Sequence, residues 1–261
     1  MNIKQSYLYF AVSAAIATSL RVLLLFFGIE AKSGFIKSEY LIPATVILAL
    51  ITVGAILSFV FALTAKATVK QSVPKSALFK ILSILLAIVI LYDTFFSRLD
   101  YSFSPWQRNL EYITAIIASV ALVSFAVMDF MGIEFPRILS IAPILFWFMR
   151  LIIIFTSLST LASIPDNIFE LAALCTILVS SLYTAKTVCR EAPPKKQPLS
   201  FALLLTTAFV CFVTALPRLI VTATGNSALL HANDLPIMTT LIAGVYFLVF
   251  AVECFKEPEK N

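Results

Sequence analysis

One apolar stretch, from about Ile138 to Ser163, has an arginine near its middle. A helix rises 1.5 Å per residue, so about 20 apolar residues cross a bilayer, and this stretch is long enough to do so. An ionised guanidinium in hydrocarbon costs from about 3 to more than 10 kcal/mol. Arg150 must therefore face protein, water or an anion, and this requirement limits how the chain can fold.

Two other apolar segments repeat this arrangement, with Arg21 in TSLRVLLLFFG and Arg218 in ALPRLIVTATG. Hydrophobic residues make up 61% of the chain and charged residues 13%. Soluble domains average about 45–50% and 25%, and the mean hydropathy here is +1.00. The sequence therefore predicts an all-α membrane protein.

The apolar pattern predicts a bundle of eight transmembrane helices forming one polytopic domain over residues 1–261, with seven spans as the alternative. The expected helices are Ser6–Gly28, Leu41–Ala65, Ala77–Phe96, Leu110–Phe130, Ile138–Ser163, Ile168–Val188, Leu199–Thr224 and Ile237–Phe255. Pro217 is expected to kink the seventh helix. The basic, proline-rich segment CREAPPKKQP favours a hinge between halves, and a division into residues 1–131 and 132–261 is the alternative to one undivided domain.

The distribution of Lys and Arg predicts that both termini are cytoplasmic. Eight spans place about three times as many basic residues in inner loops as in outer loops, which is the positive-inside pattern. The inner residues are Lys4, Lys66, Lys70, Lys75, Lys80, Arg137, Lys186, Arg190, Lys195, Lys196, Lys256 and Lys260; the outer ones are Lys32, Lys37, Arg98 and Arg108. Charge placed in this way favours anionic membrane lipids, or a protein partner at the basic loops, and argues against nucleic acid.

Taken in pairs, the predicted helices resemble four outward-pointing hairpins, which indicates a weak four-fold repeat. Each rising helix carries an ionisable residue in its outer half: Arg21, Asp93, Arg150 and Arg218. Each descending helix begins near an acid: Glu39, Glu111, Glu170 and Asp234. Internal duplication explains this pattern. So does coincidence, because acids at helix N-termini are favourable through the helix dipole.

Helical spacing places polar side chains beside the three arginines and predicts that these arginines converge at similar depth. The predicted ligand-binding residues are Arg21, Arg150, Arg218, Asp93, Thr214, Ser157 and Glu170. Arginine suits bidentate binding of phosphate or carboxylate, so one hypothesis is a small transporter or lipid-handling protein that binds an anionic solute or headgroup. The alternative is a non-transporting subunit, scaffold or sensor whose arginines form structural ion pairs.

Motifs for metal or cofactor chemistry are missing from the sequence, so we predict neither a metal nor a cofactor. The four cysteines have no CxxC spacing, His231 is the single histidine, and no HExxH or phosphate-binding loop occurs. Tyr92-Asp93 has no GxGD partner of the kind found in intramembrane aspartyl proteases. An enzymatic function is the least favoured hypothesis.

The stretch FMRLIIIFTSLSTLASIPDNIFELAALC, together with ALPRLIVTATG, resembles segments of multi-pass membrane proteins from bacterial genomes that have no assigned activity. These stretches cover under a fifth of the chain. The resemblance implies a bacterial inner (cell) membrane and implies no catalytic residues.

Overall fold

The structure is a computed structural model, and it describes residues 2–30, 34–65, 67–70, 74–96, 105–131, 136–158, 164–189, 197–226, 230 and 237–256. Within these ranges, eight helices are long and apolar enough to cross a membrane. They are α1 (Ile3–Leu23), α2 (Leu41–Thr64), α3 (Ala77–Phe96), α4 (Pro105–Phe130), α5 (Ile141–Leu158), α6 (Pro165–Val188), α7 (Gln197–Ala223) and α8 (Ile237–Cys254). The predicted all-α class is confirmed, as is the number of spans within the described residues. The division into halves and the hairpin repeat stay predictions.

Short elements extend or connect these helices. A π-helical turn, η1 (Leu24–Gly28), continues α1, and 3-10 turns precede α2 (η2, Ser38–Tyr40) and α5 (η3, Arg137–Ser140). Strand β1 (Thr68–Val69) pairs antiparallel with β2 (Phe255–Lys256), which directly follows α8. This pairing ties the segment after α2 to the end of α8.

Two of the helices that begin earlier than the apolar pattern predicts begin at a proline. α4 starts at Pro105 rather than Leu110, and α6 starts at Pro165 rather than Ile168. Proline is favoured at the first helical position because its fixed φ suits a helix and its missing N–H would be unpaired there anyway. Counting apolar residues misses these polar first turns, and in α6 the missed turn contains Asp166.

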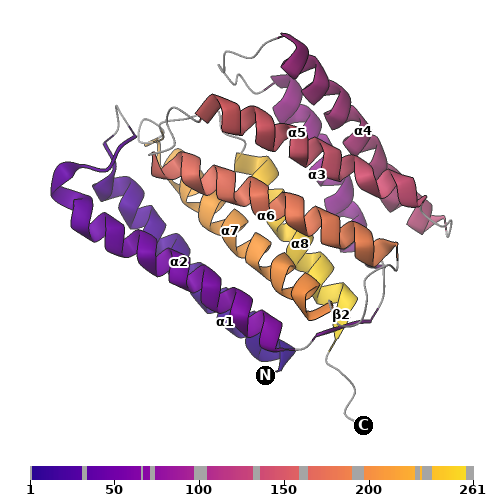
Figure 1. Cartoon of the computed structure of the whole chain (residues 1–261), viewed down its shortest axis with the longest axis horizontal. Coiled ribbons are helices and arrows are strands. Elements are labelled where there is room, and N and C mark those ends of the chain that lie inside the picture. Colours follow the sequence, from indigo (N-terminus) through magenta and orange to yellow (C-terminus); the bar gives the residue numbers. More distant parts are fainter. Residues whose placement is uncertain are drawn as a thin grey trace.

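Helix α7 is at the centre of the bundle, where it packs against α1, α2, α6 and α8 (Figure 1). Helices α1 and α2 cover one side of it, and α3, α4 and α5 lie on the other side of the molecule. Consecutive packing of α3 on α4, α4 on α5 and α5 on α6, together with α3 on α8, produces a ring of helices. The start of α1 and the end of α8 lie at one end of the bundle (Figure 1).

Large apolar side chains are exposed on the outer faces of the helices, as expected where lipid rather than water is the solvent. On α2, the residues Val46, Leu50 and Val53 are each at least half exposed. The inward positions of the ring helices recur at steps of about seven residues, such as Leu86 and Asp93 on α3. The arrangement is that of a multi-pass membrane protein with a tightly packed interior.

Candidate functional site: an ionic layer and a cavity

Buried charged residues form what we call the ionic layer: Arg21, Asp93, Glu111, Arg150, Asp166, Glu170 and Arg218. They lie late in α1, α3 and α7, early in α4 and α6, and near the middle of α5. Successive helices alternate in direction. These positions therefore lie toward the same end of the bundle, opposite the start of α1 and the end of α8. Each of these residues is at most 6% exposed.

One part of the layer is centred on Asp166 in the first turn of α6. Its carboxylate accepts a hydrogen bond from Nη2 of Arg21, and its second oxygen lies 3.6 Å from Nε of Arg218. Arg218 also donates from Nη1 to Glu170 at 2.8 Å and from Nη2 to the backbone carbonyl of Asp166 at 3.0 Å. The start of α6 therefore joins α1 to α7, because Arg21 and Arg218 share the carboxylate of Asp166.

The remaining contacts of Arg21 follow from Pro217, which lies inside α7. A proline has no backbone N–H, so it cannot donate to the carbonyl four residues before it, which belongs to Val213. Nη1 of Arg21 donates to this carbonyl at 2.8 Å, and the guanidinium carbon lies 3.8 Å from the centre of the Phe169 ring. Arg21 thus supplies the hydrogen bond that the proline removes from α7.

The second part of the layer lies between α3, α4, α5 and α8. Nη1 of Arg150 donates to Glu111 at 3.1 Å, while Asp93 accepts a hydrogen bond from Thr239 and interacts electrostatically with Arg150. Neither Nε nor Nη2 of Arg150 has a hydrogen-bond partner among the described residues. Arg150 is fully buried, so these two nitrogen atoms are buried donors without a protein partner in the described part of the chain.

The start of α8 connects the two parts. Thr239 contacts Asp93, and Oγ1 of its neighbour Thr240 lies 3.5 Å from Glu170. Both hydroxyls are in the first turn of α8, whose N-terminal dipole favours nearby negative charge. Adjacent residues on one helix therefore donate to carboxylates in both parts of the layer.

The structure brings only some of the predicted ligand-binding residues together. Arg21, Arg218 and Glu170 share one group of contacts, whereas Arg150 and Asp93 belong to the other. Thr214 is fully buried and donates to the backbone carbonyl of Phe169, with Oγ1 and O 3.3 Å apart. The side chain of Ser157 lies outside the described residues.

Acids outnumber arginines in the ionic layer. Besides Asp93, three acids are buried there with the three arginines: Glu111, Asp166 and Glu170. Two other acids were predicted near the start of a descending helix. Glu39 is exposed in η2, and Asp234 lies outside the described residues. The predicted sixth helix begins at Ile168, so the apolar pattern leaves Asp166 in the preceding loop. Its position directly after Pro165 is the signal that places it in a helix.

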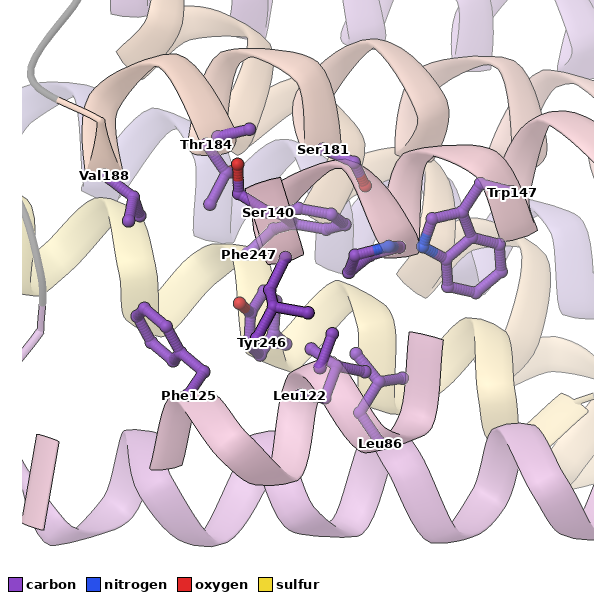
Figure 2. Close-up of a pocket in the computed structure, with 14 residues that line it drawn as sticks. Leu86, Leu122, Phe125, Ser140, Trp147, Ser181, Thr184, Val188, Tyr246 and Phe247 are labelled. Atoms are coloured by element: carbon purple, nitrogen blue, oxygen red, sulfur yellow. The ribbon is translucent and has the colours of Figure 1, made fainter. Parts of the chain in front are cut away.

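A cavity lies inside the ring of helices, in the half away from the ionic layer (Figure 2). Its walls come from α3, α4, α5 with η3, α6 and α8. It contains about 560 Å³ of empty space, part of which is open to the surface. Trp147 lines it from α5, and Arg150 lies one turn further along the same helix face.

Comparison of the chain with family models, with curated proteins and with solved structures finds no match to any of them.

Proposed function

We propose that the protein is a small transporter or lipid-handling protein, and that Arg150 contacts the anionic group of its solute or lipid. The observation that carries this proposal is the incomplete hydrogen bonding of Arg150 among the described residues. Two of its nitrogen atoms have no partner there, although the side chain is fully buried. A guanidinium with two free N–H groups matches the oxygen atoms of a carboxylate or phosphate.

The position of Arg150 supports a route for such a ligand. Pro143, Trp147 and Arg150 are spaced by four and three residues and so share one face of α5, and the first two line the cavity. An anion that enters through the cavity would reach Arg150 next along this face. The ionic layer would then close the far end of the ring, and transport would require this layer to open.

Within this proposal, Arg21 and Arg218 fix the helices rather than bind the ligand. Each of them contacts Asp166, and Arg218 contacts Glu170 as well. Removing one partner of a buried ion pair costs about 3–5 kcal/mol. These two arginines therefore serve the packing of α1, α6 and α7.

A second candidate function follows from the same contacts. All three arginines contact a carboxylate, as expected of a non-transporting subunit, scaffold or sensor whose charges hold helices in register. In that case, basic residues beside the end of α8, such as Lys70 and Lys256, would contact anionic lipid or a protein partner.

Glu111 separates the two functions experimentally. The purified protein in nanodiscs is titrated with dihexanoyl phosphatidic acid, and binding is measured by isothermal calorimetry. If Arg150 binds the headgroup, Arg150→Gln abolishes binding. Glu111→Gln strengthens it, because the carboxylate that competes for Arg150 is removed. Glu39→Gln, which neutralises an exposed acid in η2, serves as the control and retains binding.

The exchange variant Arg150→Glu/Glu111→Arg tests the alternative. A purely structural pair works in either orientation, so the exchange restores the stability that each single charge reversal removes. Restored stability, together with no anion binding by the native protein, would favour the scaffold and reject the anion site.

A further inference from the structure

Among the described residues, none that lines the cavity is charged, although the ionic layer lies in the same ring of helices. Aromatic rings form much of the surface: Phe125 on α4, Trp147 on α5, and Tyr246 and Phe247 on α8. Moving an ionised group from water into such surroundings without a counter-charge is strongly unfavourable. The cavity itself therefore favours a neutral molecule as its resident ligand, and an anion that passes through it meets a counter-charge only at Arg150.

Two polar groups on this surface lack hydrogen-bond partners within the described part of the chain. Oγ1 of Thr184 is buried and has no partner there, and the side chain lines the cavity from α6. The residue is 8% exposed. Trp147 is 2% exposed, and the contact found for its ring is with Phe146. In Figure 2 its indole nitrogen lies on the edge of the ring that faces the other labelled residues.

These unpaired groups define what a ligand must offer. An indole N–H only donates, and a threonine hydroxyl donates readily to an oxygen acceptor. Buried donors in folded proteins are almost always paired, with protein, water or ligand. Ser181, one turn before Thr184 on α6, adds a second hydroxyl to the same wall. The complementary ligand therefore carries oxygen acceptors on an otherwise apolar body.

We propose that this cavity binds a neutral, flat lipophilic molecule with carbonyl acceptors, the chemical class that includes quinones. The aromatic rings would contact its faces, while Trp147 and Thr184 would donate to its carbonyl oxygens. This site is separate from the anion contact at Arg150 and does not depend on it.

The two tryptophans of the chain provide the test. Trp106 is 60% exposed at the start of α4, whereas Trp147 is buried at the cavity. In Trp106→Phe the fluorescence comes from Trp147 alone, and in Trp147→Phe it comes from Trp106 alone. Each variant, in nanodiscs, is titrated with menadione, a neutral two-ring quinone that quenches indole fluorescence, and with 2-methylnaphthalene, which has no carbonyl.

We expect menadione to quench Trp147 saturably, and to quench Trp106 in linear proportion to its concentration in the bilayer. Thr184→Val, made in the Trp106→Phe background, should weaken the saturable phase about tenfold. 2-Methylnaphthalene should displace menadione, measured as recovery of Trp147 fluorescence, only at a concentration at least tenfold higher than that of menadione. Ala121→Leu, which fills the cavity from α4, should remove the saturable phase, and its circular dichroism spectrum checks that the variant is folded.

Quenching of Trp147 that is linear, or absent, would overturn the proposal, because the cavity would then be filled by water or inaccessible. A saturable phase that Thr184→Val and Ala121→Leu both leave unchanged would also overturn it, because the quinone would be bound elsewhere. No anion is used in these titrations, so failure of the phosphatidic acid experiment leaves their result unaffected.

Discussion

Replacing Asp166 by Asn tests whether the ionic layer holds the helices together. The change conserves shape but removes the charge that Arg21 and Arg218 share. Arg218 keeps its 2.8 Å contact with Glu170, so most of the loss falls on Arg21. Arg21 would lose its counter-charge and retain only neutral partners in the described structure, among them the carbonyl of Val213 and the ring of Phe169.

Leaving one member of a buried pair uncompensated costs about 3–5 kcal/mol, and we expect Asp166→Asn to lower the free energy of unfolding by that amount. The measurement is reversible unfolding of the purified protein in mixed micelles, with SDS as the denaturant. Glu39→Gln is the control. It removes an exposed acid from η2, and changes at exposed positions are usually within about 0.5 kcal/mol.

A double-mutant cycle assigns the loss to this pair. Arg21→Met removes the cation that Asp166→Asn leaves unpaired, so the double variant should lose about 2 kcal/mol less than the sum of the single variants. If Asp166→Asn is no more destabilising than Glu39→Gln, or if the losses simply add, the ionic layer does not carry the packing energy assigned to it.

Two further predictions concern α7. A Cβ atom at Gly244 of α8 would lie 2.7 Å from a side-chain carbon on α7, whereas at Gly54 of α2 the nearest atom is 3.5 Å away. Gly244→Ala should therefore cost about 1–3 kcal/mol and Gly54→Ala less than about 0.5 kcal/mol in the same unfolding measurement; equal costs would refute this packing. Pro217→Ala restores a backbone donor for the Val213 carbonyl. In that background Arg21→Met should cost about 1 kcal/mol less than in the native chain, and an unchanged cost would show that Arg21 does not support the carbonyl.

Hydropathy alone was enough to predict the membrane class and the eight helices. Lipid cannot pair with backbone polar groups, so a membrane span must be both apolar and helical over about 20 residues. Arg150 in such a span already implied a buried partner, because the cost of an isolated charge does not depend on the details of the fold. These conclusions depend on local composition, which is why they could be drawn without coordinates.

The pairing of charges required the tertiary structure. Glu111 and Arg150 are 39 residues apart, and Arg21 and Asp166 are 145 apart. Their contacts depend on which helices are neighbours and on the rotation of each helix about its axis. The sequence constrains neither strongly, because the outer faces of these helices are as apolar as the inner ones. That packing divides the arginines into two groups and forms the cavity that Trp147 lines. Only the folded arrangement of the helices could therefore reveal them.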